Sequence, residues 1–147
     1  MKKITSIILV FVCILLFVGC TESEVYYWEF EKDFSEISEM KIIVTPYGER
    51  FQNDTYNVVK EIDLSYASEL YKDVKSISMT KYTGSLGTPT GLCIMIKFKN
   101  GDFDLIASRE SKHYQYREDG TYDAYSSWLV SNRDEFYSII TKYISVD

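Results

Sequence analysis

The sequence predicts an α+β fold, in which an antiparallel β-sheet meander carries two amphipathic helices packed on one face. Three observations lead to this prediction: two stretches have apolar residues at helical spacing, several others alternate as strands do, and Asn100-Gly101 separates two of those strands. The order is strand-rich segment, helix, antiparallel strands and closing helix, which favours α+β over an alternating α/β fold. We expect residues 25–147 to form this single domain, because no internal repeat, low-complexity tract or second linker interrupts them.

The first part of the domain is expected to be rich in strands. Residues 25–30 alternate aromatic side chains with others, which predicts a first strand or an aromatic arm. Residues 34–40 carry apolar side chains at intervals of three, consistent with a single helical turn. The β-branched run 41–45 and the short run 58–62 predict two further strands.

Two segments have the period of an amphipathic helix. From Leu64 to Val74, apolar residues fall on one helical face, and Asp63 or Ser65 is available as the N-cap. The closing helix is expected to begin at about Asn132, which is also a good N-cap. Its apolar face carries Phe136, Ile139, Ile140 and Tyr143.

The central hairpin is the sharpest local prediction. Asn100-Gly101 is a preferred pair for a two-residue type I′ turn. Such a turn places Phe98 opposite Phe103, and further out every apolar residue on that face meets an apolar partner. The sequence therefore predicts both the hairpin and its register.

Tyrosine is unusually frequent, with 13 residues in the chain. A second hairpin is expected around Asp119-Gly120, and a two-residue turn there pairs Tyr114 with Tyr125. Tyrosine supplies rigid, amphipathic contact area, which suits the recognition of a protein or a sugar. The predicted binding patch consists of Tyr114, Tyr116, Tyr125 and Trp128. The alternative is that strands simply favour tyrosine and that half of these rings pack on the core.

The N-terminal segment carries the pattern of an exported protein. A basic start with Lys2 and Lys3 precedes the uncharged apolar run 4–18, and small Gly19 and then Cys20 follow. This order is typical of a secretory signal peptide. The apolar run is on the short side of the roughly 20 residues that a spanning helix needs.

Residues 17–20 (FVGC) resemble the lipobox of bacterial lipoprotein precursors, with Phe at the position where Leu is usual. The resemblance implies removal of residues 1–19 as signal peptide and a diacylglyceryl group, carrying fatty acids such as palmitate, on the Cys20 sulfur. The protein would then be held on the extracytoplasmic face of the cell membrane, with residues 20–24 as lipidated end and short tether. Two acyl chains suffice for stable attachment, whereas one is marginal. Composition and signal resemble those of small Gram-positive lipoproteins, although residues 21–147 match no family motif.

Charge and cysteine content exclude several function classes. Removing the signal peptide takes away two lysines and no acid, which changes the formal net charge from −6 to −8. This sign argues against nucleic acid as a partner and against a polybasic contact with anionic lipid. Only Cys93 then remains as a thiol, so neither an intramolecular disulfide nor a cysteine-based metal site is expected. Cys93 itself is expected to be a small apolar residue in the sheet.

No catalytic residue, cofactor or metal site is predicted. His113 is the only histidine, and it is expected to lie exposed in a charged loop. Asp102 and Asp104 flank a tight turn and are expected to be solvated. The Gly-rich stretch 83–91 lacks the following helix of a phosphate-binding loop and predicts a flexible connection that is able to serve in recognition.

The sequence therefore favours a non-enzymatic binding module, anchored to the membrane, that recognises an envelope protein or glycan through its tyrosine patch and the 83–91 loop. The alternative is a hydrolase acting on envelope material with an unrecognised site. A pocket in which carboxylates converge on His113 would favour the enzyme, whereas a shallow tyrosine surface would favour binding.

Overall fold

The computed structural model describes residues 24–47, 56–84 and 87–145, with the backbone alone at Tyr125 and Ser126. The predicted signal peptide, the lipidated Cys20 and most of the tether lie outside these residues. Within the described ranges, no helix is both long and apolar enough to cross a membrane.

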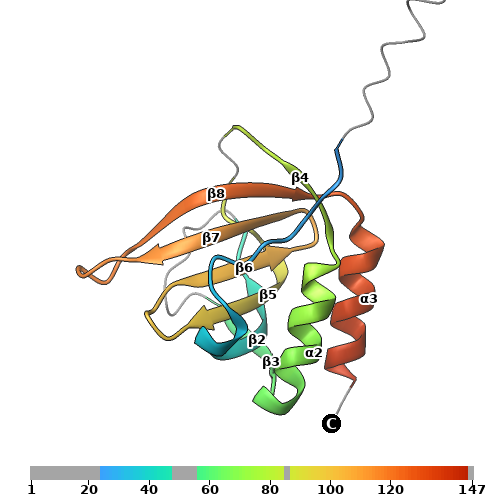
Figure 1. The fold of residues 1–147 in the computed structure, drawn as a ribbon, viewed down its shortest axis with the longest axis horizontal. Coiled ribbons are helices and arrows are strands. Elements are labelled where there is room, and N and C mark those ends of the chain that lie inside the picture. The colour runs from blue at the N-terminus through green and yellow to red at the C-terminus, as the bar shows by residue number, and fades with distance from the viewer. Residues whose placement is uncertain (1–23, 48–55, 85–86, 146–147) are drawn as a thin grey trace, which may run out of the picture.

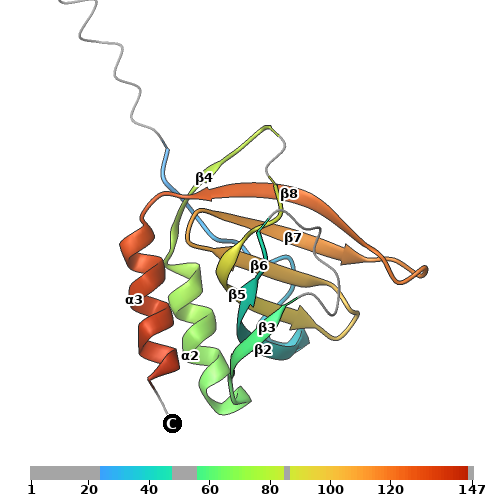
Figure 2. The same ribbon diagram turned by 180° about the vertical axis from the view of Figure 1, so that it is seen from behind.

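The described chain folds into an eight-stranded antiparallel sheet with two α-helices, which confirms the α+β class (Figure 1). The strand order across the sheet is β1-β4-β8-β7-β6-β5-β2-β3. Helices α2 and α3 lie side by side in both views (Figures 1 and 2). The elements are β1 (Tyr26–Tyr27), the 3₁₀ turn η1 (Phe34–Glu36), β2 (Ile37–Thr45), β3 (Asn57–Glu61), α2 (Leu64–Lys75), β4 (Ser78–Lys81), β5 (Gly91–Phe98), β6 (Phe103–Ala107), β7 (Glu110–Tyr116), β8 (Tyr122–Val130) and α3 (Arg133–Ile144).

Both helices begin where their caps predict. The Asp63 side chain accepts a hydrogen bond from the Ser65 N–H at 2.7 Å, which satisfies one of the free donors at the start of α2. Asn132 does the same for the Asp134 N–H at 3.1 Å at the start of α3. In contrast, the helical turn predicted over 34–40 ends early, because the chain enters β2 directly after η1.

Buried apolar side chains form two clusters, one on each face of the sheet. Successive residues of a strand point to opposite faces. In β5, Ile94 and Ile96 belong to the larger cluster, whereas Cys93 and Met95 belong to the smaller one. We call these surfaces the Ile94 face and the Cys93 face. The larger cluster also contains buried residues of both helices, namely Ala67, Leu70, Val74, Phe136, Ile140 and Tyr143.

The central hairpin forms, but the predicted register is wrong by one residue. The Phe98 N–H donates to the Asp102 carbonyl at 2.8 Å and Gly101 has a φ of 92°, which gives a three-residue loop in place of the two-residue turn. Ile96 therefore pairs with Asp104. A shift of one residue moves every side chain of a strand to the other face. Asp104 thus belongs to the Ile94 face, not to the solvated surface that was expected.

The second hairpin departs from its predicted register for the same reason. The Arg117 N–H donates to the Thr121 carbonyl at 2.9 Å, and Gly120 has a φ of 84°. The loop again has three residues, so Tyr116 pairs with Tyr122. The glycine supplies the positive φ that this loop type requires.

Candidate functional site

A buried carboxyl–imidazole pair lies on the Ile94 face. Asp104 of β6 is the direct cross-strand partner of His113 of β7, and Asp104 Oδ1 lies 2.5 Å from His113 Nδ1. The two residues are 1% and 4% exposed. The predictions of an exposed loop histidine and a solvated aspartate are therefore wrong, because the three-residue loop turns Asp104 inward and His113 lies within a strand opposite it.

The environment of Asp104 strongly disfavours its charged form. Burial raises the pKa of Asp104 to about 6, even though the hydrogen bond and the charge of His113 lower it. The charge of Glu31 raises it further, so the acidic Glu31 side chain is near enough to influence the pair. The second oxygen, Asp104 Oδ2, and the indole nitrogen of Trp28 are both buried and form no hydrogen bond within 3.5 Å to a described residue. Trp28 is nevertheless near enough to lower the pKa of Asp104.

Trp28 covers the imidazole of this pair. Its ring stacks on His113 with the ring centroids 4.4 Å apart and an angle of 28° between the planes. Phe30 contacts Trp28 edge-on and stacks on Tyr71 of α2 at 4.1 Å. The backbone N–H of Trp28 donates to the Ile77 carbonyl at 3.3 Å. These contacts hold the segment after β1 against the Ile94 face. Of the two alternatives predicted for residues 25–30, a strand forms only at Tyr26–Tyr27, and the aromatic residues after it pack as an arm.

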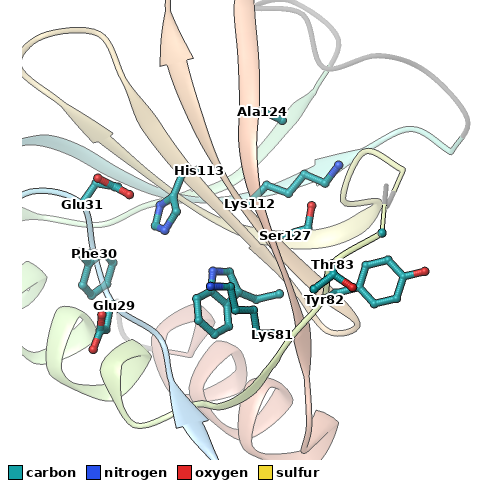
Figure 3. A pocket seen from close by; sticks show the side chains of 12 residues that line it. Glu29, Phe30, Glu31, Lys81, Tyr82, Thr83, Lys112, His113, Ala124 and Ser127 are labelled. Carbon is teal, nitrogen blue, oxygen red and sulfur yellow. The ribbon is translucent and has the colours of Figure 1, made fainter.

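A pocket of about 670 Å³ opens beside this pair (Figure 3). Four parts of the chain line it: the segment after β1, the end of β4, β7 and β8. The lining residues are Glu29, Phe30, Glu31, Lys81, Tyr82, Thr83, Gly84, Lys112, His113, Ala124, Ser127 and Trp128.

Charges of both signs line this pocket. Glu29 and Glu31 come from the segment after β1, and Figure 3 shows Glu31 at the same end of the pocket as His113. Lys81 comes from β4, where its Nζ lies 6.0 Å from the centre of the Trp128 ring. In the described part of the chain, none of these three charged side chains forms an ion pair. Their charges are therefore available to a ligand.

The pocket reaches around β8 to the other side of the sheet. Lys112 pairs with Leu105, a residue of the Cys93 cluster, so Lys112 points away from the neighbouring His113. Burial lowers the pKa of Lys112, and the charge of Glu110 opposes that shift. Ser127, the cross-strand partner of Lys112, lies on the same side.

The predicted tyrosine patch is not one surface. Tyr114 is 5% exposed and stacks on Phe103 at 4.6 Å, so its proposed exposure is wrong. Tyr116 is exposed and packs on Tyr122 at 5.5 Å. Trp128 pairs with Ser111 and lines the pocket instead. The side chain of Tyr125 lies outside the described residues.

The two remaining sequence candidates have different outcomes. Cys93 lies in the sheet as a small apolar residue, as expected, and it is fully buried. Burial raises its pKa to about 12, which makes it a poor nucleophile. Thr83 and Gly84 of the Gly-rich stretch line the pocket, whereas residues 85–86 lie outside the described ranges. Across the described residues, no group of three or more His, Cys, Asp or Glu is arranged to hold a metal ion.

Comparison with known proteins identifies no relative: no family model, curated sequence or solved structure matches the chain. A functional conclusion must therefore come from the site itself rather than from the fold.

Proposed function

We propose that this protein is a lipid-anchored, extracytoplasmic binding module that holds a small polar ligand, derived from an envelope protein or glycan, in the pocket beside Trp28. In this proposal residues 1–19 are removed and Cys20 carries the lipid. The observation that carries the binding role is the pocket itself, in which Glu29, Glu31 and Lys81 present charges that no described side chain neutralises. Concave sites with a few convergent polar groups and aromatic walls are the usual places where proteins bind small ligands.

The proposed arrangement of the helices supports this location. Both helices are proposed to cover the Ile94 face, since buried residues of both belong to its cluster. Beyond the helices, the segment after β1 covers that face through Trp28 and Phe30. The pocket opens where this covering segment meets β4 and β8.

The binding role can be tested with the two tryptophans of the chain, because Trp28 contacts the lining residue His113 and Trp128 lines the pocket. The full-length protein, purified from membranes in detergent, is titrated with the small-molecule fraction of a cell-envelope digest. We expect a saturable change in tryptophan fluorescence that is lost in Lys81→Glu and retained in Lys72→Glu, an exposed lysine of α2. No saturable change in the unmodified protein would refute the binding role.

The anchor is tested separately. Replacing Cys20 by Ala is expected to abolish labelling with a radioactive fatty acid and to release the protein from membranes. Continued labelling of the Cys20→Ala protein would contradict the proposed lipid attachment.

A second candidate function is a hydrolase of envelope material. The favouring observation is that Asp104 and Glu31 lie around His113, whose imidazole lines the pocket, which is the arrangement that the sequence led us to expect of an enzyme. A carboxylate on Nδ1 orients a histidine as a proton acceptor. Turnover of ester or amide substrates by the unmodified protein, lost in a His113→Gln protein that circular dichroism shows to be folded, would establish this function. Absence of turnover in both proteins would leave the binding role.

A further inference from the structure

We infer that the pocket selects a zwitterionic ligand, one that carries an ammonium group and an anionic group a short distance apart. This inference rests on the proposed binding function and assigns its ligand class. It follows from the charges on the Ile94 side of the pocket, which are of both signs and come from different parts of the chain.

The acidic end is the site proposed for the ammonium group. Glu29 and Glu31 are both exposed, and neither is engaged in an ion pair with a described residue. The field of Glu31 reaches the buried pair, since it opposes ionisation of Asp104. Between the two acids lies Phe30, which Tyr71 fixes by stacking. A primary ammonium group donates up to three hydrogen bonds and is favoured by carboxylates and aromatic faces together.

The basic end is the site proposed for the anionic group. Lys81 is the last residue of β4, and its main chain pairs with that of Trp128. The neighbouring Tyr82 N–H donates to the Ser127 carbonyl at 3.2 Å, which keeps the end of β4 on β8. Lys81 Nζ lies over the Trp128 ring rather than against a carboxylate. A carboxylate or a phosphate placed there would gain a charge-assisted hydrogen bond.

Selection follows from the cost of leaving one end unmatched. A ligand with a single charge can pair with either the acids or Lys81. At the other end of the pocket it displaces water from the protein's charged group and offers no opposite charge in return. A hydrogen bond to a charged group contributes enough that its loss weakens affinity by at least about tenfold. We therefore expect the zwitterion to bind at least tenfold more tightly than analogues that lack either charge.

Two sources supply this chemistry: free amino acids or peptides, and the head groups of zwitterionic phospholipids that combine phosphate with a primary ammonium. Glu29 follows Cys20 by nine positions, so a fully extended chain spans at most about 30 Å between them. With lipid on Cys20, the acidic end would stay within that distance of the membrane surface. Both sources are therefore included in the test.

The test uses the full-length protein in detergent and follows tryptophan fluorescence. Glycylglycine is compared with N-acetylglycylglycine, which lacks the ammonium group, and with glycylglycinamide, which lacks the carboxylate. Phosphoethanolamine represents the free head group. For the lipid source, the protein is reconstituted in phosphatidylglycerol nanodiscs with or without phosphatidylethanolamine. Glu31→Gln and Lys81→Gln remove one charge from each end, and Glu118→Gln, in the distant β7–β8 loop, is the matched control.

Binding of glycylglycine or phosphoethanolamine, at least tenfold tighter than binding of either capped peptide, supports the inference. A fluorescence change confined to nanodiscs with phosphatidylethanolamine also supports it and identifies lipid as the source. Glu31→Gln and Lys81→Gln should abolish the preference, while Glu118→Gln preserves it. Equal binding of the capped peptides, or no response to any of these probes, overturns the ligand class. If the envelope digest still gives a saturable signal in that case, the proposed binding function stands without the zwitterion.

Discussion

Replacing His113 by Gln removes the partner of a buried carboxyl group. Asp104 is 1% exposed, and its pKa is already raised to about 6. Without the imidazole, the carboxyl group avoids an unpaired charge by taking up a proton, which costs about 1.4 kcal/mol at pH 7, one unit above that pKa. Loss of the charge-assisted hydrogen bond adds about 1.5–3 kcal/mol. The free energy of unfolding is therefore expected to fall by about 3–4 kcal/mol at pH 7.

The dependence of this loss on pH follows from the raised pKa of Asp104. Because the folded state favours the protonated carboxyl group up to about pH 6, Asp104 is largely neutral at pH 5, and the cost of protonation disappears there. Because the carboxyl group is neutral at pH 5, the hydrogen bond lost there is an ordinary one, and the loss in His113→Gln should shrink to about 0.5–1.5 kcal/mol. In the unmodified protein the folded state holds the Asp104 proton more tightly than the unfolded chain does, so this group makes stability fall as pH rises from about 3.8 to about 6.

Urea unfolding followed by tryptophan fluorescence, at pH 5 and pH 7, measures both quantities. A double-mutant cycle with Asp104→Asn isolates the interaction between the two side chains. We expect the double variant to be markedly less destabilised than the sum of the single variants. At pH 7, a loss below about 1 kcal/mol in His113→Gln, or additivity of the two substitutions within about 0.5 kcal/mol, would refute the assignment of a coupled buried pair.

Three further predictions concern the fold. Gly101→Ala should lower the free energy of unfolding by about 1–3 kcal/mol in urea titrations. The added Cβ would lie 3.1 Å from the Tyr116 ring, and the backbone φ of 92° is unfavourable for alanine. Gly87→Ala is the control and should have little effect, because no atom lies within 4 Å of the added Cβ. Asn132→Ala should cost about 1 kcal/mol through loss of the α3 cap, with reduced helicity by circular dichroism, and Asn132→Asp should retain stability. Cys93, whose pKa burial raises to about 12, should resist a thiol-reactive disulfide reagent at pH 8 until the protein is unfolded with urea; rapid modification of the native state would contradict its burial.

Local features of the sequence were sufficient for the elements. The apolar period from Leu64 to Val74 and the caps at Asp63 and Asn132 act within one or two turns of chain, and the helices begin where these features predict. The turn pair at Asn100 likewise predicted the central hairpin, because its conformational preference does not depend on the rest of the fold.

The candidate site was missed because it depends on register. An Asn-Gly pair fits both a two-residue turn and a three-residue loop with glycine at positive φ, and the two choices bury opposite faces of the strands. The three-residue loop would have placed Asp104 opposite Ile96 and so indicated a buried acid. Nothing in the local sequence selects between the two loop lengths. The loop length depends instead on which side chains of the two strands are buried in the two apolar clusters.

Local sequence patterns were therefore enough for the α+β class, the two helices with their caps and the existence of the central hairpin. Tertiary structure alone decided that Asp104 and His113 meet, because they lie on different strands and come together only through pairing in the sheet. It also decided that Trp28 covers them, since that contact joins residues 85 positions apart through packing on the Ile94 face. Short-range preferences are encoded within a few residues, whereas a site assembled across strands depends on the burial of the whole core.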